Sequence, residues 1–134
     1  MILSLFIFHT LSGCTQDSDN TDIDSNGVQN LTALECFEII EGVEEGDVII
    51  LDIRTPGEYE GGRIPGAINL DYLSPEFRNN LKKLDSEKTY LIYCRTGGRS
   101  GRSLAVFEEE GFTKIYHMNR GIAEWLRENL PLEE

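Results

Sequence analysis

Residues 90–100 read Tyr-Leu-Ile-Tyr-Cys-Arg-Thr-Gly-Gly-Arg-Ser, and this stretch indicates the fold of the chain. The apolar run 90–93 predicts a buried strand. A short glycine-containing loop follows it, and a helical pattern begins at about Ser100. Cys94 therefore lies between the end of a strand and the N-terminus of a helix. Open α/β sheets place their functional sites at this position, just beyond the carboxyl ends of the strands.

The loop that begins at Cys94 has the composition of an anion-binding site. Backbone N–H groups of a glycine-containing loop can converge on one point, and a helix N-terminus adds partial positive charge. Arg95 and Arg99 add full charges, and such surroundings favour the nucleophilic thiolate form of cysteine. A cysteine at a strand end can instead be a small buried hydrophobic residue, but arginines beside a structural cysteine have no packing purpose. We therefore predict that Cys94 is a catalytic nucleophile. The residues predicted to bind its substrate are Arg95, Thr96, Gly97, Gly98, Arg99 and Ser100.

Strand and helix patterns alternate on both sides of this stretch. The segment 48–53 is apolar on both faces, as central parallel strands are. Thr32 and Glu35 form a capping box for a helix over 31–40, and Ser74 and Pro75 begin another helix. The other expected elements are strands over 67–70, 89–93 and 114–118, a helix from about Ser100 to Gly111, and a helix over 122–129 with Trp125 and Leu126 packing inward. The alternation predicts an α/β fold with a central, mostly parallel sheet flanked by helices.

Three charged residues at the end of the strand 48–53 are expected to support the structure. A carboxylate such as that of Asp52 needs a partner if it is buried at the end of an apolar strand. Arg54 and Glu58 follow in a turn that enters a short helix, where these two residues could pair. We predict a structural network of ion pairs and capping bonds here, in preference to a catalytic role.

Composition limits the possible functions. The chain has 134 residues, enough for one domain, and a formal net charge of −12. This charge argues against binding of nucleic acid, which needs clustered Lys and Arg, and against docking to a membrane through basic residues. The cysteines, Cys14, Cys36 and Cys94, are odd in number and have no zinc-like spacing. No metal or cofactor is expected, and Cys36 is expected to be structural.

The N-terminal residues predict export and anchoring. The short apolar run 2–8 fits the hydrophobic part of an export signal. Leu11-Ser12-Gly13-Cys14 resembles the lipobox of bacterial lipoproteins, which implies cleavage before Cys14 and a lipid on its sulfur, although residues 1–11 lack Lys and Arg. The alternative is a buried N-terminal strand with an incidental cysteine. We expect a signal peptide over 1–13, a disordered polar tether over 14–30 and a folded domain over 31–134, held in the cell envelope and facing the periplasm or the exterior.

Two segments of the expected domain resemble the rhodanese-like family. Residues 51–59 (Leu-Asp-Ile-Arg-Thr-Pro-Gly-Glu-Tyr) with 62–69 (Gly-Arg-Ile-Pro-Gly-Ala-Ile-Asn) are similar to the N-terminal motif of that family. Residues 94–100 are similar to its active-site loop. Two positions depart from the commonest form: Arg63 stands where histidine is frequent, and Asn119-Arg120-Gly121 stands where a pair of glycines often precedes the last helix.

The resemblance implies a three-layer fold and a sulfurtransferase. In such an enzyme the Cys94 thiolate would take a sulfane sulfur from a small anionic donor such as thiosulfate. Sulfite would leave, and the Cys94 persulfide would pass its sulfur to a thiol or protein acceptor. The resemblance implies no cofactor, and a monomer is expected.

Other functions are compatible with parts of the pattern. Cysteine phosphatases, including a rhodanese-like branch, use Cys-x5-Arg, whereas Cys94 and Arg99 are spaced as Cys-x4-Arg, which makes a cradle better suited to sulfur than to phosphate. A non-catalytic rhodanese-like binding module is a second alternative, although such modules often lose the cysteine. A third is a persulfide carrier that serves one membrane partner and turns over slowly on free thiosulfate.

Overall fold

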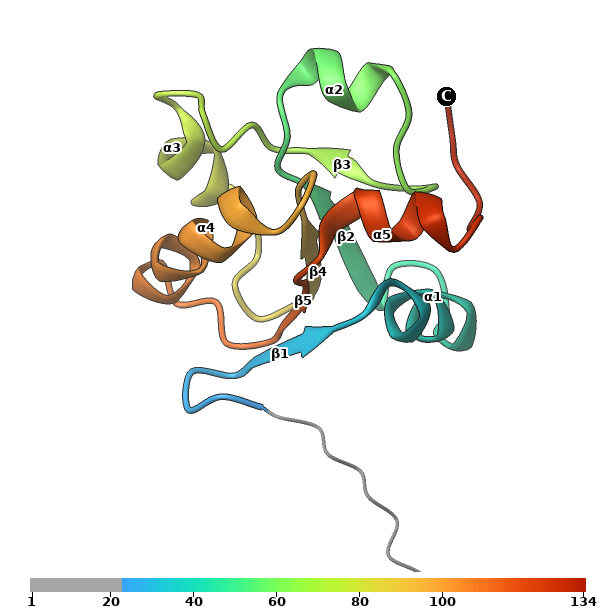
Figure 1. Cartoon of the computed structure of the whole chain (residues 1–134). Coiled ribbons are helices and arrows are strands. Elements are labelled where there is room, and N and C mark those ends of the chain that lie inside the picture. Colours follow the sequence, from blue (N-terminus) through green and yellow to red (C-terminus); the bar gives the residue numbers. More distant parts are fainter. Residues whose placement is uncertain (1–22) are drawn as a thin grey trace, which may run out of the picture.

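Five parallel strands form the centre of the molecule (Figure 1). The computed structural model describes residues 23–134. The strands are β1 (Val28–Leu31), β2 (Val48–Asp52), β3 (Ile68–Asn69), β4 (Thr89–Tyr93) and β5 (Ile115–Met118). Their order across the sheet is β1-β5-β4-β2-β3, and every neighbouring pair is parallel. The predicted α/β fold is therefore confirmed, with a sheet that is parallel throughout.

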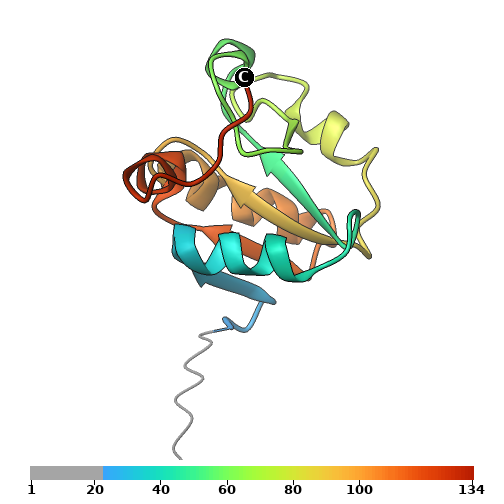
Figure 2. The ribbon, with the colours of Figure 1, turned by 90° about the vertical axis from the view of Figure 1, so that its right-hand side faces the viewer.

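Helices cover both faces of this sheet. The helices are α1 (Ala33–Gly42), α2 (Pro56–Glu60), α3 (Phe77–Leu81), α4 (Gly98–Glu109) and α5 (Gly121–Arg127). In Figure 1, α1 and α5 lie on one side of the strands and α3 and α4 on the other, while α2 lies beyond one edge. Figure 2, which looks onto the first side, shows α1 and α5 in front of the sheet. The result is three layers, with helices on both faces of the sheet.

The alternation of side chains along β4 divides the core into two clusters. Tyr90 and Ile92 point to the face covered by α3 and α4, where they pack with Phe107. Leu91 and Tyr93 point to the opposite face. Each fully buried side chain of this size contributes about 1.5–3 kcal/mol relative to an exposed one. A strand apolar on both faces is therefore stable only at the centre of a layered sheet, and β4 has two strand neighbours.

The folded region begins earlier than the sequence predicted. Val28–Leu31 forms the edge strand β1, paired in register with β5, and the Val28 side chain is buried. The expected tether over 14–30 is therefore wrong at 28–30, because two polar residues within a four-residue edge strand hide its periodicity. Residues 24–27 make a turn before it, in which Asp24 accepts hydrogen bonds from the backbone of Asn26 and Val28. The expected signal peptide, Cys14 and most of the tether lie outside the described residues.

Two helices also differ from their sequence predictions. The predicted capping box of Thr32 and Glu35 is present at the start of α1, although this helix spans Ala33–Gly42 instead of the predicted 31–40, because Leu31 belongs to β1 and Thr32 is the N-cap. The helix predicted to begin at Ser74, however, begins at Phe77, because the Ser74 hydroxyl accepts from the amide of Glu76 within a turn instead of capping the helix. In α5 the Trp125 side chain is buried, but Leu126 is 49% exposed, which corrects its expected inward packing. None of the helices within residues 23–134 has the length and apolar character needed to cross a bilayer.

Candidate active site

The loop after β4 turns back tightly because of one glycine. Gly97 has a φ of +102°, in the left-handed region, and a Cβ atom placed on it would lie 1.9 Å from the carbonyl oxygen of Asn119. Only glycine fits at this position. The turn lets α4 begin at Gly98, only four residues after Cys94. The N-terminus of α4 is thereby directed at the cysteine, as the sequence predicted.

Hydrogen-bond donors surround the Cys94 sulfur. The amide of Gly97 lies 3.1 Å from Sγ, the amide of Ser100 3.4 Å and the Ser100 hydroxyl 3.3 Å. Burial opposes ionisation of the Cys94 thiol, which is only 1% exposed. Hydrogen bonds from the Ser100 hydroxyl and from the amides of Ser100, Gly97 and Thr96 outweigh burial, so the pKa of Cys94 lies below its ordinary value. The site therefore favours a thiolate.

The start of α5 holds the first half of the loop. The amides of Ile122 and Ala123 donate to the carbonyl oxygens of Cys94 and Arg95, at 2.9 and 3.0 Å. This close approach needs Gly121, whose φ is +67° and whose Cβ, if present, would lie 2.3 Å from the Arg95 oxygen. The loop is thus fixed between two helix N-termini, those of α4 and α5.

Arg99 is held by Glu58 across the mouth of the site. Its two terminal nitrogens donate to the two carboxylate oxygens of Glu58, each at 2.8 Å. These hydrogen bonds, with those from Thr55, overcome partial burial and lower the pKa of Glu58 to about 2. Arg99 therefore does not face an anion alone, as the loop composition suggested, because its charge is largely balanced by α2.

A buried ion pair lies behind this contact. Asp52 is fully buried and accepts from Arg54 at 2.7 Å and from the Tyr93 hydroxyl at 2.7 Å. The other bonds of Arg54 go to Asp52 and to the carbonyl oxygen of Gly62, so the expected pairing of Arg54 with Glu58 is replaced by two separate pairs. Asp52 and Arg54 thereby connect β2 to the segment that leads into β3.

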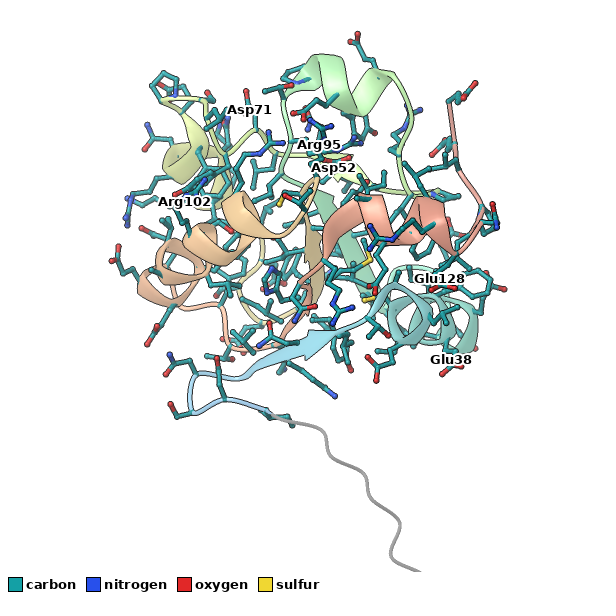
Figure 3. The ribbon with its side chains drawn as sticks, in the orientation of Figure 1. Glu38, Asp52, Asp71, Arg95, Arg102 and Glu128 are labelled. Atoms are coloured by element: carbon teal, nitrogen blue, oxygen red, sulfur yellow. The ribbon has the colours of Figure 1, made fainter. Side chains whose placement is uncertain are left out.

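A recess of about 420 Å³ opens beside the loop at the carboxyl edge of the sheet. Its wall combines arginine side chains with apolar groups of α5, and the lining residues are Arg54, Glu58, Arg95, Ile122, Ala123 and Leu126. Figure 3 shows Arg95 in this region, between α2 and α5. The structure contains no ion pair of Arg95 among residues 23–134, so this guanidinium is available to a ligand.

The sequence model of the rhodanese-like domain family matches residues 38–128. This range includes the loop that begins at Cys94 and the helices α4 and α5, which hold it. The chain belongs to the rhodanese-like family. A protein of Allochromatium vinosum named sulfurtransferase is 34% identical over 86 residues, which cover 64% of this chain and 78% of that protein. A rhodanese-related protein of Thermoplasma volcanium has a solved structure with a TM-score of 0.66 and 27% identity, covering 78% of this chain and 96% of that one.

Larger proteins contain similar regions. The tRNA uridine(34) hydroxylase of Hamiltonella defensa is 33% identical over 109 residues, which cover 74% of this rhodanese-like chain but only 30% of the hydroxylase. The chain therefore spans less than a third of that relative. The similarity therefore indicates a shared domain. The activity named for the whole hydroxylase is not transferred to this chain.

One buried residue of this rhodanese-like site was missed in the sequence. The Nε2 atom of His117 lies 2.7 Å from the Ser100 hydroxyl, and its Nδ1 atom lies 2.8 Å from Oδ1 of Asn30. Burial lowers the pKa of His117 to about 4, so the ring is neutral near pH 7. The position of His117 in a predicted strand was visible, but its closeness to Ser100 depends on β5 lying beside β4. Within residues 23–134, no three His, Cys, Asp or Glu side chains are grouped as metal ligands.

Proposed function

We propose that this protein is a sulfurtransferase that moves a sulfane sulfur from thiosulfate, or a similar donor, to a thiophilic acceptor through a Cys94 persulfide. The observation that carries the proposal is the ring of donors around a buried sulfur with a lowered pKa. A relative whose name is sulfurtransferase, and which shares 34% identity over 86 residues, supports it. The short Cys-x4-Arg loop supports sulfur in preference to phosphate.

The first half-reaction loads the enzyme. The Cys94 thiolate attacks the outer sulfur of thiosulfate, the S–S bond of the donor breaks, and sulfite leaves with the bonding electron pair. The product is a persulfide, Cys94–S–S⁻, so sulfur and charge balance. The amides of Gly97 and Ser100 stabilise the negative charge on the sulfur. Arg95, in the adjoining recess, is placed to attract the anionic donor.

The second half-reaction transfers the sulfur from the Cys94 persulfide to an acceptor. A nucleophilic acceptor, such as cyanide or a thiolate, attacks the terminal sulfur of the persulfide. The bond between the two sulfurs breaks, and Cys94 leaves as a thiolate that the same donors stabilise. The apolar wall of the recess, formed by Ile122, Ala123 and Leu126, suits an acceptor with carbon next to its sulfur.

Mass spectrometry of the intact protein tests the first half-reaction. The full chain is incubated with thiosulfate beside Cys94→Ser and beside Cys36→Ala, a matched control in which the other cysteine of the folded region is changed. We expect a gain of one sulfur atom in the unmutated protein and in Cys36→Ala, and none in Cys94→Ser. Sulfur loading that persists in Cys94→Ser would contradict the mechanism. If the protein takes sulfur from a low-molecular-weight persulfide but not from thiosulfate, its function is instead that of a persulfide carrier.

We propose in addition that a lipid on Cys14 anchors the protein to a membrane of the cell envelope. The lipobox-like residues 11–14 and the acidic, polar stretch after them support this proposal. Cells that express the full chain are fractionated beside cells with Cys14→Ser. The expected result is that the unmutated protein sediments with membranes and the variant does not. Membrane association that survives the substitution would require a different anchor.

A further inference from the structure

A chain of hydrogen bonds leads away from the Cys94 sulfur into the sheet. Sγ contacts the Ser100 hydroxyl at 3.3 Å, this hydroxyl contacts Nε2 of His117 at 2.7 Å, and Nδ1 of His117 contacts Oδ1 of Asn30 at 2.8 Å. We propose that Ser100 and His117 form a proton relay that takes up the thiol proton of Cys94 and so prepares the nucleophile. This inference rests on the proposed function of Cys94 and adds a positioning residue, His117, that acts through Ser100.

The sheet register explains why these residues meet. His117 pairs with Ile92 of β4 on one side and with Asn30 of β1 on the other. Parallel neighbours in register present their side chains to the same face, which is the face where Ile92 packs and which α4 covers. Cys94 follows Ile92 by two positions and points to that face as well. Sulfur, hydroxyl and imidazole are thus gathered under the first turn of α4.

This chain of hydrogen bonds runs from buried groups to an exposed one. Cys94, Ser100 and His117 are 1%, 0% and 4% exposed, whereas Asn30 lies exposed at the edge strand. With Oδ1 of Asn30 accepting from Nδ1–H, the neutral ring has Nε2 free to accept the proton of the Ser100 hydroxyl. The hydroxyl also approaches the carbonyl oxygen of Gly97, at the longer distance of 3.2 Å. Its oxygen then offers a lone pair to the thiol proton of Cys94.

The proposed step moves protons and leaves oxidation states unchanged. The thiol proton passes to the Ser100 oxygen while the hydroxyl proton passes to Nε2 of His117. The products are a thiolate that accepts from the Ser100 hydroxyl and an imidazolium that donates to Ser100 and Asn30. Opposite charges attract strongly in a buried site, so the thiolate raises the proton affinity of His117 when it forms.

The charged groups near the relay act on its Cys94 end. Arg99 of α4, paired with Glu58 of α2, interacts electrostatically with Cys94 and with Asp52 of β2. The groups in contact with the ring nitrogens of His117 are the neutral Ser100 and Asn30. Burial lowers the pKa of His117, so the ring is neutral in the resting site. Burial alone also weakens its proton affinity, so the relay requires the charge of the nearby thiolate to stabilise the imidazolium.

Alkylation of Cys94 by iodoacetamide, followed over a range of pH in the full chain, tests the relay. The Cys94 peptide is quantified by mass spectrometry, so that the other cysteines do not contribute. His117→Gln can hydrogen-bond to Ser100 but cannot take up a proton. Relative to the unmutated protein, we expect alkylation at about pH 7 to slow by roughly tenfold or more and the midpoint of the pH profile to rise by about one unit. Ser100→Ala should have a similar effect, and Cys36→Ala should have none.

The double variant His117→Gln/Ser100→Ala distinguishes a relay from two independent contacts. Residues that act in series give a double variant no slower than the slower single variant, whereas independent contributions add. Additive effects, or a pH profile of His117→Gln that coincides with that of the unmutated protein, would overturn the proposal. Asn30→Ala, at an exposed position, provides a variant that should fold and shift the midpoint in the same direction by a smaller amount.

Sulfur loading separates failure of the relay from failure of the proposed function. Alkylation needs no sulfur donor, so it reports on the thiolate whether or not the protein transfers sulfur. If the relay is correct, His117→Gln should recover sulfur loading from thiosulfate at a pH above the raised midpoint, where the thiolate forms without help. A thiolate that forms normally but takes no sulfur from any donor would contradict the proposed function and leave the relay intact.

Discussion

The charge of Arg99 can be read from the sequence, whereas its ion-pair partner is known only from the structure. The loop sequence places two arginines beside Cys94, but both terminal nitrogens of Arg99 donate to Glu58 of a different element. Of these two loop arginines, only Arg95 has no ion-pair partner in the part of the chain that the structure describes. In the proposed reaction, the attraction of an anionic donor therefore depends on Arg95, on the backbone amides, and on the balance between Arg99 and Glu58.

Glu58→Gln should improve the use of thiosulfate. The amide keeps the shape of the carboxylate, and its one oxygen can still accept from Thr55 and from one terminal nitrogen of Arg99, but it no longer offsets the arginine charge. We expect the KM for thiosulfate to fall by about threefold to tenfold at low salt, and to approach the unmutated value as salt screens the charge. Arg99→Ala, which leaves Glu58 uncompensated, should raise KM. Steady-state kinetics measure both, and changes of the same sign in the two variants would refute the electrostatic account.

At the scale of single residues, the sequence singled out Cys94, the proposed nucleophile, and missed two of the contacts around it. Cys94 was recognisable because strand, loop and helix signals are contiguous in the chain. His117 was not, because its contact with Asn30 joins residues 87 positions apart and requires the strand order β1-β5-β4. The pairing of Glu58 with Arg99 spans 41 positions and was hidden for the same reason. Short sequence patterns predict which groups are close together along the chain. Contacts between residues on different strands can be predicted only when the strand order is known.

At the scale of elements, the loop that begins at Cys94 is held in place by helix termini. α4 presents its N-terminus to the sulfur, and α5 donates to the two carbonyl oxygens at the start of the loop. The boundaries that the sequence mispredicted are those of short elements, β1 and α3, which have four and five residues. Periodicity needs more residues than these contain, whereas the longer α4 and the apolar β2 and β4 were predicted well.

Gly121→Ala should displace the loop. The substitution forces a side chain into a left-handed conformation and places its Cβ 2.3 Å from the Arg95 oxygen. We expect the free energy of unfolding to fall by about 1–3 kcal/mol and alkylation of Cys94 at neutral pH to slow, because the loop amides move. Gly101→Ala is the matched control, since a Cβ there meets no atom within 4 Å. Gly101 lies inside α4, so its replacement should stabilise the protein by about 0.5–1 kcal/mol. Urea unfolding distinguishes the two, and equal effects would argue against the steric explanation.

At the scale of the whole molecule, buried titratable groups make stability depend on pH. His117 has a pKa of about 4 in the folded protein, where burial disfavours its charge, against an ordinary value of 6.5. Between these two values the unfolded chain binds more protons than the folded one, so stability is lost as the pH falls from 6.5 toward 4. Glu58, with a folded pKa of about 2, adds a second window, in which stability is lost as the pH falls from 4.5 toward 2.

Urea unfolding at several pH values tests this assignment. In the unmutated protein the free energy of unfolding should decrease by roughly 2–4 kcal/mol across the upper window. His117→Gln should be less stable at neutral pH but should lose this slope, since glutamine does not titrate. Glu58→Gln serves as the control, because it should keep the upper slope and lose the lower one. An unchanged upper slope in His117→Gln would assign the acid sensitivity to other groups.

The sheet separates the two cysteines of residues 23–134, and this separation limits how the site can recover from oxidants. Cys94 packs in the cluster on the α4 side, whereas Cys36 packs on the α1 side, where burial, with smaller contributions from Glu35 and Glu124, raises its pKa to about 12. If a peroxide converts Cys94 to a sulfenic acid, the folded domain offers no resolving thiol to form an internal disulfide. Reduction then depends on a thiol that diffuses in from outside the domain. The rate of repair should rise in proportion to the concentration of that thiol and should vanish without it.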